Sequence, residues 1–348
     1  MNSTNSPEDF DYIIVGAGSA GCVLANRLTE DPGTSVLLLE YGGKDDSIFV
    51  QMPTALSIPM SMPRFNWGFW SEAEPNINDR LIDVSRGKTI GGSSSINGMI
   101  YVRGNACDLD QWEELGAQGW GYRNCLPYYK KAENCAYGED EYRGGEGLLH
   151  TCNGNGMKNP LYRAFIEAGG EAGYGITDDY NGYRQEGMCR MDMTVKNGVR
   201  CSTANAYLKP VLHRSNLTLL MHALTKKVVL EGKKAVGVEF ERDGKTHIVK
   251  ANREVILSAG SIGSPHIMQM SGMGPSQVLK DAGIEVVHEL PGVGENLNDH
   301  LESVIQYETK LPVSLNRHMG PFGKFLIGAR WYLFKSGLGV TNHFESTG

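Results

Sequence analysis

The chain has 348 residues, and its 33 basic and 40 acidic side chains give a formal net charge of −7. This length suits two domains, and an acidic balance without a large basic block argues against nucleic acid as a partner. No apolar run reaches the length of a membrane span and residues 1–11 lack signal-peptide features, so we expect a cytoplasmic protein that could also lie peripherally on the inner membrane. The seven scattered cysteines form no CxxC pair, which argues against a metal site.

The first predicted element is a short apolar strand at residues 12–15, which is followed by the sequence GAGSAG and an apolar-periodic helix. This pattern fits the dinucleotide-binding turn. Gly16 allows the tight turn, Gly18 lets a pyrophosphate approach the backbone, and Gly21 allows close packing of helix on strand. A second apolar strand at residues 35–39 ends in Glu40, which is placed to accept hydrogen bonds from ribose hydroxyls. The spacing alone does not decide between NAD and FAD.

Residues 44–85 look irregular, and a second glycine-rich segment follows them. Residues 86–104 read RGKTIGGSSSINGMIYVRG, which combines a basic start, paired glycines and a serine triplet. The glycines let the backbone approach a ligand closely, and the serines offer hydroxyls and amides to phosphate oxygens. The composition favours a loop around an anionic cofactor, and the alternative is a mobile surface loop.

The remaining elements are predicted from the spacing of apolar residues and from the glycines and prolines that interrupt helices and strands. Helices are predicted at residues 108–115, 126–132 and 159–172, and short strands at residues 217–221, 228–231, 235–241, 247–250 and 255–258. These strands suggest a small meander that returns to the main sheet. A further glycine-rich turn follows the last strand, and a helix is predicted to open with Ser264 as its N-cap and Pro265 at its first position. A purely structural cap is the alternative to a ligand-binding turn.

The three glycine-rich segments together resemble the glucose-methanol-choline (GMC) oxidoreductases, and the resemblance runs over essentially the whole chain. It implies an α/β fold: a doubly wound, Rossmann-like FAD-binding domain with a discontinuous α+β substrate-binding domain that is incomplete here. The expected FAD-binding domain comprises residues 1–155 and 200–305. The expected partial substrate-binding domain comprises residues 156–199 and 306–348.

The resemblance also implies FAD as the cofactor. Some relatives attach the flavin through a histidine in the loop that carries the serine triplet, which we call the serine loop (residues 86–104). Ile96 stands at that point here, so we expect non-covalent FAD. The residues expected to bind it are Gly16, Gly18, Gly21, Glu40, Arg86, Gly91, Gly92, Ser93, Asn97, Gly98 and Met99.

The chemistry implied is oxidation of an alcohol by hydride transfer to the flavin, with choline or a similar small alcohol as substrate. Glu302 is similar to a carboxylate that binds the trimethylammonium group in choline-oxidising relatives, and Trp67, Trp70 and Phe344 are candidate aromatic partners of that cation. The alternatives are a solvated surface carboxylate and ordinary core aromatics. The apolar segment at residues 322–334 could rest on a membrane that supplies an electron acceptor. The alternative, which its short length favours, is a helix of the substrate-binding domain that is left partly uncovered.

No catalytic residue is predicted within this chain. The resemblance places the catalytic histidine in a C-terminal HPxGT-like segment, which we expect to lie beyond Gly348, so neither His300 nor His343 takes that role. Three functions stay open. The first is oxidation of choline to betaine aldehyde for glycine betaine synthesis. The second is oxidation of another alcohol within the same family. The third is a non-catalytic fragment that binds FAD.

Overall fold

The computed structural model describes residues 9–153, 155–300 and 302–348, and its contacts divide the chain into two compact units. The predicted FAD-binding domain extends without a break to residue 155, whereas residues 97–155 belong to the second compact unit. The functional role of each unit therefore stays a prediction. Unit 1 comprises Met1–Asp45, Met60–Ile96 and Thr203–Val304, and unit 2 comprises Asp46–Pro59, Asn97–Ser202 and Ile305–Gly348.

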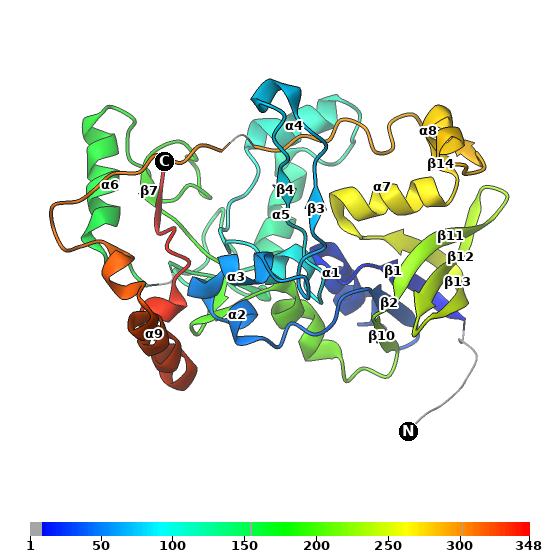
Figure 1. Cartoon of the computed structure of the whole chain (residues 1–348), viewed down its shortest axis with the longest axis horizontal. Coiled ribbons are helices and arrows are strands. Elements are labelled where there is room, and N and C mark those ends of the chain that lie inside the picture. The colour runs from blue at the N-terminus through cyan, green and yellow to red at the C-terminus, as the bar shows by residue number, and fades with distance from the viewer. Residues whose placement is uncertain (1–8, 154, 301) are drawn as a thin grey trace. The chain divides into compact units, whose positions relative to one another are not determined.

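Unit 1 is built on a six-stranded sheet in the order β10-β2-β1-β13-β12-β11. β10, β2, β1 and β13 run parallel, and β13, β12 and β11 form an antiparallel meander (Figure 1). The strand order reverses between β1 and β13, and ligands bind at such switch points in open α/β sheets. The strands are β1 (Phe10–Val15), β2 (Val36–Glu40), β10 (Leu217–Met221), β11 (Leu224–Glu231), β12 (Lys234–Arg242) and β13 (Lys245–Leu257).

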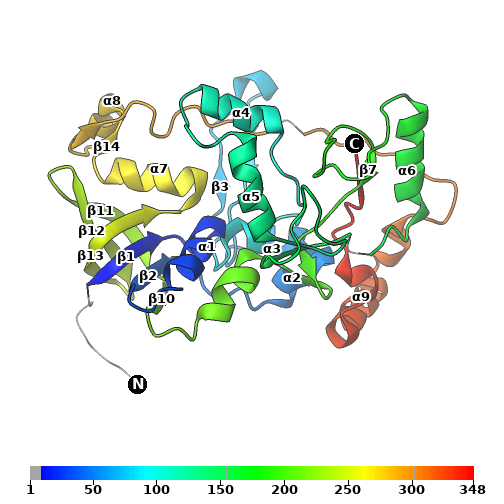
Figure 2. The ribbon, with the colours of Figure 1, turned by 180° about the vertical axis from the view of Figure 1, so that it is seen from behind.

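The parallel strand β2 is buried on both faces of the sheet. All five residues of β2 are buried, as expected of a strand inside a parallel sheet. Leu37 and Leu39 pack with Ile267 of helix α7 (Gly260–Met270), and Figure 1 shows α7 lying along the sheet. Helix α1 (Ser19–Leu28) follows β1 and packs beside β1 and β2 (Figure 2) through small residues that include Gly21 and Ala25. The predicted strand–turn–helix–strand unit is confirmed.

The last strand of the meander corrects one prediction. The two strands predicted at residues 247–250 and 255–258 form the single strand β13. Its first half pairs antiparallel with β12, up to the pair Gly237 and Lys250, and its second half pairs parallel with β1, from Phe10 and Ala251 onwards. The polar residues between the halves resemble a turn in the sequence. They stay extended because β12 pairs with the residues before them and β1 pairs with the residues after them.

The start of α7 corrects a second prediction. The helix begins at Gly260 with Ala259 as its N-cap, so Pro265 lies inside it instead of at its first position. Ser264 Oγ accepts a hydrogen bond of 3.0 Å from the backbone N–H of Ala259, and so links the second turn of the helix to the N-cap residue. The prediction of Ser264 as the N-cap is therefore wrong, because Ala259 holds that position without a side-chain cap. The other elements of unit 1 are β3 (Phe69–Trp70), β4 (Asp83–Val84), β14 (Met273–Gly274), α8 (Ser276–Asp281) and β15 (His288–Glu289).

Unit 2 is made of helices and short strand pairs. Its helix α6 (Pro160–Glu171) confirms the prediction at residues 159–172, with the Asn159 side chain accepting from the Leu161 N–H as N-cap. Helix α5 (Tyr122–Ala132) begins earlier than predicted and contains Pro127. The other elements of unit 2 are α2 (Ile48–Gln51), α3 (Ser57–Met60), α4 (Ala106–Glu114), β5 (Glu133–Cys135), β6 (Leu149–Thr151), β7 (Cys189–Arg190), β8 (Val195–Lys196), β9 (Val199–Arg200), α9 (Pro321–Phe334) and β16 (Ser346–Thr347).

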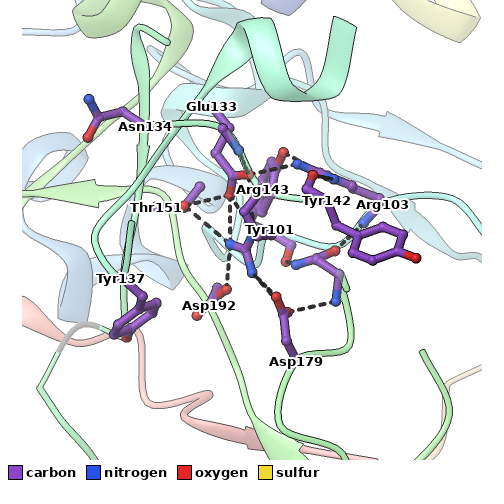
Figure 3. Close-up of polar contacts among 12 residues, drawn as sticks. Tyr101, Arg103, Glu133, Asn134, Tyr137, Tyr142, Arg143, Thr151, Asp179 and Asp192 are labelled. Carbon is purple, nitrogen blue, oxygen red and sulfur yellow. Dashed lines mark hydrogen bonds and ion pairs between the residues drawn. The ribbon is translucent and has the colours of Figure 1, made fainter. Parts of the chain in front are cut away.

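A buried network of ion pairs holds part of unit 2 together (Figure 3). The carboxylate of Glu133 is fully buried, and it accepts hydrogen bonds from Arg143 Nη2 at 2.6 Å and from Arg103 Nη2 at 2.7 Å. Arg143 also donates to Asp192 and to Asp179, each at 2.8 Å. Buried charges are tolerated only when they are paired and hydrogen-bonded. The network therefore ties together chain segments that are far apart in sequence.

Candidate functional site

A cavity of ≈ 690 Å³ lies in unit 1 at the carboxyl ends of its parallel strands. β1 leads into it through Gly16, β2 through Glu40, and β13 through Ser258. This is the edge at which the strand order reverses, so the fold places the cavity where doubly wound sheets bind ligands. Of the predicted cofactor-binding residues, six line the cavity wall: Gly16, Gly18, Glu40, Arg86, Gly92 and Ser93.

The first glycine turn is packed too tightly for any side chain. Gly16 has φ +98°, and a Cβ on it would lie 2.6 Å from the carbonyl oxygen of Ser258. A Cβ on Gly21 would lie 1.9 Å from the carbonyl oxygen of Gly16, so Gly21 allows helix α1 to approach the strand without lining the cavity itself. Gly18 is the N-cap of α1, and no side chain accepts a hydrogen bond from the backbone N–H groups of the first turn. These N–H groups are therefore available to bind an anionic ligand.

The serine loop closes over this turn. The Gly91 N–H donates to the carbonyl of Ala17 at 2.7 Å, and a Cβ on Gly92 would lie 2.7 Å from the Cα of Gly18. The serines act differently from the prediction, because only Ser93 faces the cavity. Ser94 Oγ donates to the Gly91 carbonyl, and Ser95 Oγ is buried and donates to the Ile90 carbonyl, so these hydroxyls hold the loop in shape.

Glu40 places a buried carboxylate in the cavity wall. Its Oε2 accepts from the Ala17 N–H at 2.9 Å and its Oε1 accepts from the Gly42 N–H at 2.7 Å. Burial raises the pKa of Glu40 to about 7, although both backbone hydrogen bonds oppose the rise. Each carboxylate oxygen can accept a second hydrogen bond, so Glu40 is placed to receive hydroxyl groups from a ligand.

Two further side chains in the cavity wall were missed from the sequence. Ser258 Oγ and Thr225 Oγ1 are buried and have no hydrogen-bond partner within the part of the chain that the structure describes. Leaving a buried hydroxyl unpaired costs about 1–3 kcal/mol, so both atoms indicate a polar ligand. The position of Ser258 directly after the apolar residues 255–257 is the signal that the sequence offers. No feature of the sequence singled out Thr225.

An aromatic stack forms another part of the wall. Trp67 stacks on Tyr41 with ring centroids 4.9 Å apart, and on Phe69 at 5.7 Å. All three rings line the cavity together with Glu40. The structure therefore places Trp67, a predicted partner of the substrate cation, in the same wall as the predicted ribose-binding residue.

The other predicted residues belong to different parts of the chain. Asn97, Gly98 and Met99 begin the central segment of unit 2. There Arg200 Nη1 donates to the Asn97 carbonyl at 2.8 Å, and the buried Met99 has φ +60°. Phe344, also in unit 2, lies beside Gly98, with its Cε2 3.7 Å from the position of a Cβ there. Glu302 is exposed in unit 1. Among the described helices, none is both long and apolar enough to span a bilayer.

Comparisons with known proteins place this geometry in context. A family model described as GMC oxidoreductase matches residues 10–302. The chain is 57% identical over 347 residues to a protein of Photobacterium profundum named oxygen-dependent choline dehydrogenase, with 99% of this chain and 60% of that one covered. It is 59% identical over 340 residues to a protein of the same name from Vibrio vulnificus, with 97% and 61% covered. The chain thus spans about 60% of the length of these relatives.

The fold also matches solved structures. One is described as an FAD-dependent oxidoreductase from Chaetomium thermophilum. It superposes with a TM-score of 0.85 at 28% sequence identity, covering 97% of this chain and 61% of that one. The α/β fold with a parallel sheet, predicted from the sequence, is confirmed by both the strand topology and this match.

Proposed function

Because the chain belongs to the GMC oxidoreductase family, we propose that unit 1 binds the ADP half of FAD and that the protein containing this sequence oxidises choline to betaine aldehyde. The observation that carries the proposal is the unit 1 cavity, where two glycine loops and one buried carboxylate meet. The names of the relatives in Photobacterium and Vibrio support choline as the substrate.

The residues of the cavity fit the ADP half of FAD group by group. The first-turn amides of α1 and the side-chain-free surfaces of Gly18 and Gly92 suit the pyrophosphate, and Arg86 adds positive charge to the same wall. Glu40 would accept the ribose hydroxyls. The orphaned hydroxyls of Ser258 and Thr225 would gain partners from the same ligand. We assign the aromatic stack that contains Trp67 to this nucleotide and not to the substrate.

The remaining expected contacts lie in unit 2. When bound, FAD supplies the two-electron acceptor for the hydrogen that leaves the alcohol carbon as hydride. Asn97, Gly98 and Met99 would contact the isoalloxazine end of FAD. Ile96 is 2% exposed and offers no atom for a covalent bond, which supports non-covalent attachment. We propose that Glu302 of unit 1 recognises the quaternary ammonium group of choline by charge.

The electron acceptor is a separate proposal. Helix α9 exposes Phe322, Phe325, Leu326 and Leu333 at helical spacing, which supports a peripheral contact between a cytoplasmic protein and a membrane that holds the acceptor. The two relatives are named oxygen-dependent, so molecular oxygen is the competing acceptor. Choline-dependent oxygen uptake, compared with reduction of a soluble quinone, distinguishes the two.

Anaerobic addition of choline to the full-length, FAD-loaded protein that contains this sequence tests the proposed reaction. Bleaching of the visible flavin band and formation of betaine aldehyde are expected. The control substrate is 3,3-dimethylbutan-1-ol, which has the shape of choline without its charge. Equal bleaching by both alcohols would favour another alcohol-oxidising function of the same family. Tight FAD binding without bleaching by any alcohol would favour a non-catalytic flavin-binding role.

A further inference from the structure

Two buried or half-buried residues of unit 2 share an unusual backbone conformation. Met99 has φ +60° and His343 has φ +66°, and neither is a glycine. A left-handed backbone costs an ordinary residue about 1–2 kcal/mol, so it persists only where surrounding contacts enforce it. Such residues cluster at sites where geometry matters for function.

A single hydrogen bond joins the neighbours of these two residues. Asn342 Nδ2 donates to the carbonyl of Gly98 at 2.6 Å. Asn342 precedes the strained His343, and Gly98 precedes the strained Met99. The same asparagine uses its Oδ1 to accept from the Phe344 N–H at 3.0 Å, so its amide orientation is fixed from both ends.

The segment around Asn342 is itself firmly held. The His343 N–H donates to Thr341 Oγ1 at 3.0 Å, and Tyr162 Oη donates to the His343 carbonyl at 3.2 Å. The imidazole Nε2 of His343 forms a hydrogen bond with the Thr54 hydroxyl. Glu345 is 1% exposed, and its carboxylate accepts from Thr341 Oγ1 at 2.6 Å. These hydrogen bonds fix the backbone of residues 341–345, and with it the position of Asn342.

The turn that Asn342 contacts is fixed on its other side as well. Arg200 Nη1 donates to both the carbonyl and the Oδ1 of Asn97, at 2.8 and 2.9 Å, and Arg200 Nε donates to the Val50 carbonyl at 2.7 Å. The Thr194 N–H donates to the Met99 carbonyl at 2.8 Å. Between these anchors, and within the part of the chain that the structure describes, the Gly98 carbonyl accepts a hydrogen bond from Asn342 alone.

We propose that Asn342 is a positioning residue: its bond to the Gly98 carbonyl fixes the turn of Asn97, Gly98 and Met99 in the conformation that contacts the flavin. The inference rests on the proposed function, because that function places this turn at the isoalloxazine. Asn342 touches neither flavin nor substrate in this account. It acts through the peptide that joins Gly98 to Met99. The N–H of this peptide donates to Asn97 Oδ1 at 3.1 Å, so rotation of the peptide would break that bond and change the shape of the turn.

Replacing Asn342 by aspartate in the FAD-loaded protein is the first test. Aspartate keeps the acceptor for the Phe344 N–H and removes the donor to Gly98. We expect kcat for choline to fall about tenfold to a hundredfold with KM little changed, because a small misplacement of a reacting group slows the reaction by that order. We also expect a shifted visible flavin spectrum, and faster amide hydrogen exchange in the peptide that contains Met99.

Asn134→Asp is the matched control, because Asn134 Nδ2 donates to the carbonyl of Gly145 at 2.8 Å elsewhere in unit 2. It should leave kcat and the flavin spectrum unchanged. Equal losses in N134D and N342D would overturn the proposal, since they would indicate general destabilisation. Asn342 is 1% exposed, and a buried aspartate can prevent folding, so Asn342→Ser is the second variant. Its short side chain cannot span to Gly98, and it should repeat the effects of N342D.

Failure of this inference differs from failure of the proposed function. If the wild-type protein is not reduced by choline, the proposed function fails. If the wild type is reduced while both Asn342 variants match its kcat, flavin spectrum and exchange at Met99, only the positioning role is overturned. A variant with loosened exchange at Met99 but wild-type kcat and spectrum would overturn it too.

Discussion

Gly92 and Gly18 lie so close together that a Cβ on Gly92 would stand 2.7 Å from the Cα of Gly18. The serine loop and the first glycine turn therefore touch backbone to backbone, although they are far apart in sequence. Both glycines also line the unit 1 cavity. The contact explains why glycine is needed in both loops: each removes the side chain that would separate them.

Gly92→Ala should lower FAD affinity at least tenfold, because the new methyl group would push the serine loop away from α1. The backbone at Gly92 has φ +52°, so the substitution also adds strain. Gly232→Ala is the matched control, since Gly232 has φ +62° but no described atom lies within 4 Å of its added Cβ. It should cost about 1–2 kcal/mol of stability without weakening FAD binding. Titration of FAD by calorimetry measures both, and equal affinities in the two variants would contradict the account.

The affinity for FAD should depend on pH through Glu40. Burial raises the pKa of Glu40 to about 7 in the free protein, and ribose hydroxyls bind best to the ionised carboxylate. Binding then lowers that pKa, so affinity should be constant above about pH 7 and fall by up to tenfold per unit as pH drops below it. Glu40→Gln should bind weakly with a flat profile over the same range. A parallel pH dependence in the wild type and in the Gln variant would exclude Glu40 as its source.

The sequence predicted the nucleotide edge of unit 1 well because that edge depends on local rules. The turn at Gly16 and the acidic end of β2 follow from strand periods and glycine spacing, and the structure places both in one cavity. Features that depend on distant partners were missed. The sequence does not show that a strand runs on from β12 to β1 in β13, or that Asn342 reaches the carbonyl of Gly98, since each depends on tertiary contacts.

Arg143→Met should destabilise the protein by about 3–5 kcal/mol, because it leaves the fully buried Glu133 and the buried Asp192 without a main partner. Urea unfolding followed by circular dichroism measures the change. The control is Lys226→Met, which removes an exposed pair with Glu241 and should change stability by less than about 1 kcal/mol. If both variants unfold at the same urea concentration, the network is not what stabilises unit 2.

Glu302→Gln should reduce kcat/KM for choline about tenfold or more, because the carboxylate would no longer offset the ammonium charge of the substrate. The same change should leave kcat/KM for 3,3-dimethylbutan-1-ol within about twofold, since that alcohol has no charge to pair. Steady-state kinetics on both substrates provide the comparison. Equal losses for the two alcohols would remove Glu302 from substrate recognition.

Titration of the purified chain with FAD, in the presence and absence of ADP, tests most directly whether the unit 1 cavity holds the ADP half of the cofactor. We expect saturable binding of one FAD per chain. ADP should compete for the site, riboflavin should not, and Gly92→Ala should weaken binding. FAD binding that ADP does not displace and that Gly92→Ala leaves unchanged would contradict it.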